Sequence, residues 1–138
     1  MLDASVAACW VLRNPLQVKA LKLRTEYEQN IHELIARSHF PGEIASALTK
    51  AERQKLIPVG DALLLIQDIL KTPPVLYAID SLYYRAVEIS SNTRTAFYDC
   101  LYVALAERQN CELITVDDKL INALQRQFSF ILSLASLP

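Results

Sequence analysis

The stretch YDCLYVALAERQNCELITVD, residues 98–117, joins an apolar helical pattern to a short apolar strand pattern. Its first half spaces apolar side chains three to four positions apart, which predicts a helix over 96–107. Its second half contains a short apolar run bounded by polar residues, which predicts a strand over 113–116. A helix followed closely by a buried strand is typical of an α/β domain.

The same two patterns alternate through the rest of the chain. Short apolar runs predict further strands over 34–36, 75–79 and 128–132. Amphipathic runs predict further helices over 16–29, 43–56 and 61–70. Strands separated by helices imply a parallel sheet between layers of helices. In such sheets the functional site lies outside the carboxyl ends of the strands, so polar residues that follow strands are the first candidates.

Length and composition restrict the class of protein. The chain has 138 residues, 52% of them hydrophobic, and we treat residues 1–138 as a single domain with its own core. Fourteen basic and fifteen acidic side chains give a net charge of -1, which excludes a broad basic surface for nucleic acid or an anionic membrane. The only glycines, Gly42 and Gly60, are too far apart for a glycine-rich phosphate-binding loop.

Cysteines and uncharged segments indicate the compartment. Cys9, Cys100 and Cys111 are odd in number and lack a C-x-x-C pair, so we expect buried thiols in a reducing cytoplasm. The longest uncharged run, 127–138, is shorter than the ~20 residues that span a bilayer. The N-terminus also lacks the basic segment of a signal peptide. We therefore expect a cytoplasmic protein without a membrane partner.

Four of the fifteen acidic residues lie in unusual surroundings. Asp3 precedes the uncharged run 4–12, and Asp117 follows the predicted strand 113–116. Glu43 opens an apolar helical stretch. Asp99 lies within the predicted helix, where its neighbours three, four and seven positions later are apolar or aromatic. An ionised carboxylate on such a face is costly unless a partner compensates its charge.

Each of these acids also has a simpler structural explanation. Asp3 and Asp117 suit the N-caps of following helices, and Asp118 competes with Asp117 for that role. Glu43 suits the first turn of a helix, where a negative charge interacts favourably with the dipole. Asp99 is the hardest to explain structurally, because no Arg or Lys lies within one helical turn of it.

Taken together, the four acids predict a metal site. If they converge at the carboxyl edge of one sheet, each close pair repels by roughly 4 kcal/mol at an effective dielectric constant of 20. Such a cluster requires protons or cations, and oxygen ligands alone favour Mg²⁺ or Mn²⁺ over zinc. Ions held by carboxylates activate water and stabilise charge in phosphodiester cleavage, which is the chemistry of a nuclease.

Four segments of the chain share a recognisable pattern: MLDASVA (1–7), PGEIASAL (41–48), YDCLYVALAER (98–108) and LITVD (113–117). Together they resemble the PIN domain family, and within it the VapC-type toxin ribonucleases of toxin–antitoxin pairs. The similarity extends nearly from end to end, and the part from 98 to 117 is the most specific. The short first segment is weak on its own.

The resemblance implies more than the residue spacing does. It implies a three-layer α/β/α PIN-like fold with a central five-stranded parallel sheet, and RNA cleavage by metal-activated water with Mg²⁺ or Mn²⁺. The catalytic and metal-binding residues would be Asp3, Glu43, Asp99 and Asp117. Small polar residues at Ser5 and Thr115 would support the metal site. It also implies a homodimer and inhibition by a VapB-like antitoxin.

One departure from the family pattern concerns the first strand. Only Met1 and Leu2 precede Asp3, where family members have four or five apolar residues, so we expect a shortened strand and a frayed terminus that holds Asp3 poorly. Two explanations remain open: a start further upstream or a weakened site. The alternative function is therefore a catalytically silent PIN-like module that binds RNA or a protein partner.

Basic residues and histidines near the predicted acidic site are secondary candidates for a functional role. Arg37 and Arg94 lie near the predicted edge of the site, where they could steer phosphate, although a solvated surface position is the simpler expectation. His32 and His39 lack the spacing of metal ligands, so an edge position and a loop are expected for them.

Overall fold

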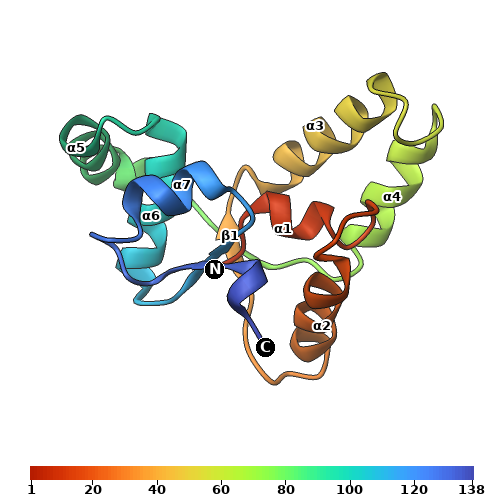
Figure 1. Ribbon diagram of the computed structural model, residues 1–138, viewed down its shortest axis with the longest axis horizontal. Coiled ribbons are helices and arrows are strands. Elements are labelled where there is room, and N and C mark those ends of the chain that lie inside the picture. The colour runs from red at the N-terminus through yellow and green to blue at the C-terminus, as the bar shows by residue number, and fades with distance from the viewer.

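The computed structural model describes residues 1–138 and places short strands between two groups of helices (Figure 1). The helices are α1 (Ala4–Ala8), α2 (Gln17–Glu28), α3 (Phe40–Arg53), α4 (Asp61–Ile69), α5 (Tyr83–Thr93), α6 (Phe97–Gln109) and α7 (Asp118–Leu124). The strands are β1 (Ile35–Arg37), β2 (Val75–Tyr77), β3 (Leu113–Thr115) and β4 (Ile131–Ser133), and 3₁₀ turns cover Asp80–Leu82 and Leu134–Ser136. This arrangement agrees with the predicted α/β class.

The strands form two parallel pairs. β1 pairs with β2, with Ile35 opposite Val75, and β3 pairs with β4, with Leu113 opposite Ile131. The central five-stranded sheet that the resemblance implied is not present as such. Every strand has three residues, and between the two pairs lies only the short N-terminal segment.

The segment Met1–Asp3 connects the two pairs. The Leu2 N–H donates to the Ile35 carbonyl of β1 at 2.8 Å, and the Ile114 N–H of β3 donates to the Met1 carbonyl at 3.0 Å. The Asp3 N–H donates back to the Ile114 carbonyl at 3.1 Å. The segment forms a single parallel bridge, with Leu2 opposite Ile114, and no full strand. The expected fraying is wrong, since Leu2 is fully buried and the segment is hydrogen-bonded to Ile35 on one side and to Ile114 on the other.

The strands separate two hydrophobic cores by simple alternation. Leu2, Ala36 and Ile114 pack with the buried side chains of α1 to α4. Their chain neighbours Met1, Ile35 and Leu113 belong to the second core, with α5, α6 and α7. Successive side chains of an extended segment point to opposite faces, so three neighbouring segments contribute to both cores in register.

Several element boundaries differ from the sequence predictions. The strand predicted over 34–36 is displaced by one residue, so that Arg37 closes it. The strand predicted over 75–79 ends at Tyr77, and the strand predicted over 128–132 begins only at Ile131. Helix α5 had not been predicted, whereas α2, α3, α4 and α6 match predicted helices within a few residues.

The ends of the helices follow local chemistry. Pro41 lies in the first turn of α3, as expected. Helix α4 begins after Gly60, whose φ of 96° favours glycine. Glu52 accepts hydrogen bonds from the Gly60 and Ala62 N–H groups at 2.9 Å, which fixes the turn between α3 and α4.

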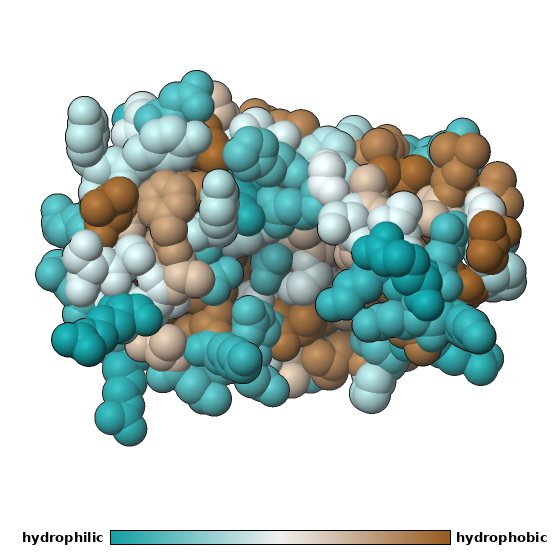
Figure 2. All heavy atoms as spheres, turned by 90° about the horizontal axis from the view of Figure 1, so that it is seen from above, coloured by the Kyte–Doolittle hydropathy of each residue, from teal (hydrophilic) through white to brown (hydrophobic).

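None of the helices has the length and apolarity needed to cross a bilayer. The thiols of Cys9 and Cys100 are buried, as predicted, whereas Cys111 is partly exposed. Large apolar side chains are nevertheless exposed where α3 and α4 meet, and they form part of the brown surface in Figure 2. They include Leu56, Val59, Leu63 and Leu64.

Candidate active site

Asp3, Thr115 and Asp117 form one hydrogen-bonded group at the end of β3. The Thr115 hydroxyl donates to the Asp3 Oδ2 at 2.5 Å, and the Thr115 Oγ1 accepts the Asp117 N–H at 3.0 Å. Thr115 is fully buried and Asp3 nearly so. The Ser5 N–H donates to the Asp3 Oδ1 at 3.2 Å, while the Ser5 hydroxyl is buried without a partner. Both predicted supporting residues therefore lie beside Asp3.

Asp3 and Asp117 also act as the helix caps proposed for them. The Asp3 Oδ1 caps α1 through its bond with Ser5. The Asp117 Oδ1 caps α7 by accepting the N–H groups of Lys119 and Leu120 at 2.9 and 3.3 Å. Asp118 is the exposed first residue of that helix and is not its cap. A cap uses only part of a carboxylate's accepting capacity, so capping and cation binding are compatible.

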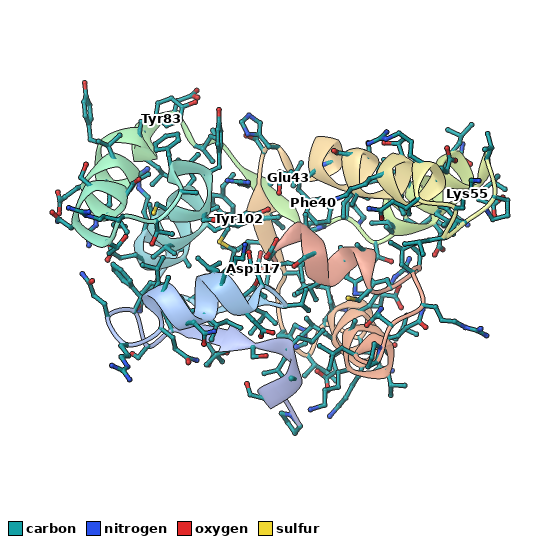
Figure 3. All side chains as sticks on the ribbon, turned by 45° about the horizontal axis from the view of Figure 1, so that its top comes forward. Phe40, Glu43, Lys55, Tyr83, Tyr102 and Asp117 are labelled. Carbon is teal, nitrogen blue, oxygen red and sulfur yellow. The ribbon has the colours of Figure 1, made fainter.

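Glu43 lies in the first turn of α3 and is held by two buried side chains. The Arg37 Nε donates to the Glu43 Oε1 at 2.6 Å, and the Tyr102 hydroxyl donates to the Glu43 Oε2. The Arg37 guanidinium carbon lies 3.8 Å from the centroid of the Tyr102 ring, and its Nη1 donates to the Tyr98 carbonyl at 2.7 Å. Figure 3 shows Glu43, Tyr102 and Asp117 facing one another between the two groups of helices.

Asp99 lies in the first turn of α6, close to the other three acids. Burial raises its pKa, and the negative charges of Asp117, Asp3 and Glu43 raise it further. Only Arg37 opposes this shift. Asp99 is half-buried and its carboxylate has no hydrogen-bond partner within the chain. The other three predicted acids therefore all lie within electrostatic reach of Asp99, although the segments that carry them are far apart in sequence.

The site fits a hard divalent cation by its chemistry and lacks a finished coordination geometry. Its donors are carboxylate and hydroxyl oxygens, which suit Mg²⁺ or Mn²⁺, and three of the carboxylates lack a cationic partner. No three acidic, histidine or cysteine side chains are arranged so that they would hold one ion together. Side chains must therefore move before an ion is bound by three of them.

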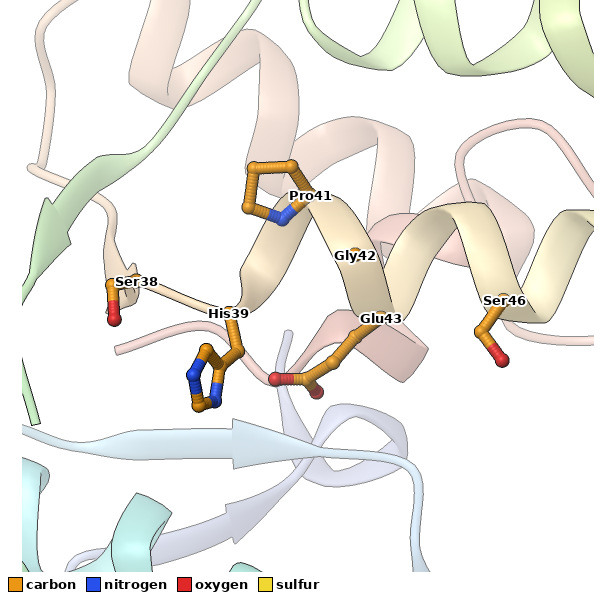
Figure 4. Close-up of a pocket in the computed structure, with 6 residues that line it drawn as sticks. All are labelled: Ser38, His39, Pro41, Gly42, Glu43 and Ser46. Atoms are coloured by element: carbon orange, nitrogen blue, oxygen red, sulfur yellow. The ribbon is translucent and has the colours of Figure 1, made fainter.

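A hollow of about 470 Å³ opens beside Glu43. It lies at the start of α3 and is lined by Ser38, His39, Pro41, Gly42, Glu43 and Ser46 (Figure 4). His39 and Glu43 extend from the same side of this turn. Glu43 is the one acid of the group among the residues that line the hollow.

Sequence reasoning placed Arg37 near the edge of the site and missed Tyr102. The solvated surface position expected for Arg37 is wrong, because only 6% of its surface is exposed. Tyr102 is an apolar position of the predicted helix 96–107, and its sequence context does not distinguish it from a core aromatic. One signal was available for Arg37, since it directly follows the predicted strand 34–36 and therefore lies at the carboxyl edge. Arg94 is exposed and lies at the end of α5.

Comparison with known proteins identifies similar sequences. A model of the PIN domain family matches residues 1–124. "VapC ribonuclease Mb0985" of Mycobacterium bovis is 35% identical over 101 residues, covering 69% of this chain and 78% of that protein. "Ribonuclease VapC12" of Mycobacterium tuberculosis is 32% identical over 121 residues, covering 87% of this chain and 88% of that protein.

Proposed function

The chain belongs to the PIN domain family, and from that premise we propose that it is an endoribonuclease dependent on Mg²⁺ or Mn²⁺. Asp3, Glu43, Asp99 and Asp117 are the acids assigned to the metal site. The observation that carries the proposal is the position of Asp99, an unpartnered carboxylate whose pKa is raised by burial and by three other acids. A cluster of this kind favours a bound cation.

The residues of the chain have separate tasks in this proposal. Thr115 and Ser5 orient Asp3, and the cap of α7 orients Asp117. Asp99 has a carboxylate without a hydrogen-bond partner in the chain, so it is the acid of the group most open to a cation or to the attacking water. A bound Mg²⁺ or Mn²⁺ would supply water activation and stabilisation of charge at the phosphodiester.

The partners are proposed from the relatives and the surface. The relatives are named VapC ribonucleases, which supports RNA as the substrate and a VapB-like antitoxin as the inhibitor. The exposed apolar side chains around α4 support a protein partner, either the antitoxin or a second copy in a homodimer. We propose that the protein acts in the cytoplasm, where RNA is available. The chain has a net charge of -1 and does not attract RNA through its overall charge. A cation bound at the acidic site would help that site to accept RNA.

RNA cleavage by the purified protein tests the proposal. The assay uses a mixed RNA substrate with Mg²⁺, with Mn²⁺ or with EDTA, and compares the wild type with Asp99→Asn. We expect cleavage only with a metal ion and a loss of roughly 100-fold or more in the variant. Equal cleavage by both proteins would indicate a contaminant or another site.

The second candidate is a catalytically silent PIN-like module that binds RNA or a protein partner. It is favoured by the absence of a finished three-ligand metal geometry and by the Arg37–Glu43 pair within the acidic site. Tight RNA or partner binding without cleavage of any RNA, with either metal ion, would support this function over the nuclease.

A further inference from the structure

The pair between Arg37 and Glu43 places a protein cation inside the acidic site. We propose that Arg37 is a built-in counter-ion of this site: it occupies Glu43 when no metal is bound, so that a divalent cation gains Glu43 as a ligand only when the pair opens. This inference rests on the proposed metal site and concerns its regulation by a residue of the chain. Arg37 is thus a positioning residue that acts through Glu43.

Both carboxylate oxygens of Glu43 are already engaged. Oε1 accepts from the Arg37 Nε at 2.6 Å, and Oε2 accepts from the Tyr102 hydroxyl. Charge-assisted hydrogen bonds of this kind are roughly twice as strong as neutral ones. Glu43 is therefore the one acid of the cluster that is held by a protein cation, whereas the carboxylate of Asp99 has no hydrogen-bond partner.

Arg37 is fixed in its place. It is 6% exposed, its ring-stacked guanidinium lies 3.8 Å from the Tyr102 centroid, and its Nη1 donates to the Tyr98 carbonyl. Two of its nitrogens are thus committed to the protein, which makes it poorly suited to bind an RNA phosphate. Exposed pairs such as Arg85–Glu107, at 37% and 38% side-chain exposure, lack this enclosure and contribute little.

The electrostatic consequence is a reduced negative charge in the metal-free site. The positive charge of Arg37 acts on Asp99 as well as on Glu43, so one guanidinium offsets part of the repulsion between Asp99 and the other acids. A substitution that removes the positive charge of Arg37 and keeps Glu43 makes the site more negative and frees the Glu43 carboxylate from its ion pair. That change should strengthen the binding of a divalent cation.

Mn²⁺ affinity, measured by isothermal titration calorimetry on the full chain, tests this inference without RNA or catalysis. Arg37→Gln should bind Mn²⁺ about tenfold more tightly than the wild type, which corresponds to about 1.4 kcal/mol. Adding Glu43→Gln to Arg37→Gln should return the affinity to about the wild-type value, because the released ligand is gone. Arg37→Lys retains the cation and should give no gain.

A matched control separates this effect from a general change of charge. Arg85→Gln also removes one arginine from an Arg–Glu pair, but that pair is exposed on α5 and α6. The Arg85→Gln substitution should therefore leave the Mn²⁺ affinity unchanged. Asp99→Asn should abolish most Mn²⁺ binding and identifies the site that the titration reports.

The outcomes distinguish the inference from the function on which it rests. If Mn²⁺ binds and depends on Asp99, but Arg37→Gln binds no more tightly than the wild type, the inference is wrong and the metal site stands. If neither the wild type nor Arg37→Gln binds Mn²⁺, both the inference and the proposed metal site are wrong. Should Arg37→Gln fail to fold, Arg37→Met, which keeps an unbranched side chain and removes the charge, takes its place. A folded Arg37→Met protein that binds Mn²⁺ no more tightly than the wild type would also overturn the inference.

Discussion

The Thr115 hydroxyl donates a 2.5 Å hydrogen bond to the Oδ2 of Asp3, a residue 112 positions earlier in the chain. Thr115 closes β3, and the N-terminal segment that carries Asp3 bridges to the same strand at Ile114. The bond therefore fixes the carboxylate at the junction of the two strand pairs. It connects the stability of the fold directly to the candidate active site.

Thr115→Val tests this connection, because valine keeps the shape of threonine and lacks the hydroxyl. Asp3 would lose a buried donor, and we expect a loss of about 1–3 kcal/mol in the free energy of unfolding, measured by urea denaturation. Mn²⁺ affinity should fall as well, since Asp3 would be less well oriented. Thr115→Ser keeps the hydroxyl and should retain the Mn²⁺ affinity. Equal Mn²⁺ affinity in the valine variant would show that the bond is purely structural.

Two substitutions at Asp117 separate its cap from its charge. Asn caps helices about as well as Asp, so Asp117→Asn should keep the stability of the fold and lose RNA cleavage. Asp117→Ala removes the bonds to the Lys119 and Leu120 N–H groups and should also cost about 0.5–2 kcal/mol of unfolding free energy. Thermal unfolding and RNA cleavage of both variants provide the measurement. An active Asp117→Asn protein would leave Asp117 with its capping role alone.

The acids of the site could be predicted from sequence because each violates a local pattern. Asp99 interrupts an apolar helix face without a basic neighbour, and Asp117 follows a short buried strand. These are local signals. Their convergence depends on the strand arrangement, which the α/β alternation and the rule on carboxyl ends already indicate. The structure brings them within electrostatic reach, as that reasoning expected.

Other features of the fold and the site could not be predicted from sequence, because they depend on contacts between segments that are distant in the chain. Arg37 resembles any surface arginine until the first turn of α3 brings Glu43 back to it and α6 supplies the Tyr102 ring. Helix α5 is rich in Tyr, Val, Ile, Ser, Thr and Asn, which are weak helix formers, so its helical state comes from packing against α6. The single bridge at Leu2 likewise depends on two strands contributed by distant segments.

The raised pKa of Asp99 predicts a pH-dependent stability of the metal-free protein. Because its pKa in the folded state lies above the ordinary value of 3.8, the folded state binds this proton more tightly than the unfolded state. Proton binding by Asp99 therefore stabilises the folded state at low pH. This stabilisation is lost as the pH rises above 3.8 and through the pKa of Asp99 in the folded state. Asp99→Asn should therefore become progressively more stable than the wild type as the pH rises.

Urea denaturation in EDTA at several pH values from 4 to 8 checks this expectation. The difference in unfolding free energy between Asp99→Asn and the wild type should grow with pH in favour of the variant. Adding Mg²⁺ should stabilise the wild type and leave Asp99→Asn nearly unchanged. Asp80→Asn, which removes the same charge at an exposed position, is the control. A difference that does not vary with pH would contradict the electrostatic explanation.

Leu2→Ala tests whether the N-terminal segment supports the site. Leu2 is fully buried against the core formed by α1 to α4, so its truncation should cost about 2–5 kcal/mol of unfolding free energy. The same substitution at Leu63, which is 64% exposed, should change stability by less than about 0.5 kcal/mol. Because Leu2 directly precedes Asp3, a folded Leu2→Ala protein should also bind Mn²⁺ more weakly, whereas Leu63→Ala should not. Wild-type stability and Mn²⁺ affinity in Leu2→Ala would mean that the bridge between β1 and β3 neither holds the two strand pairs together nor orients Asp3.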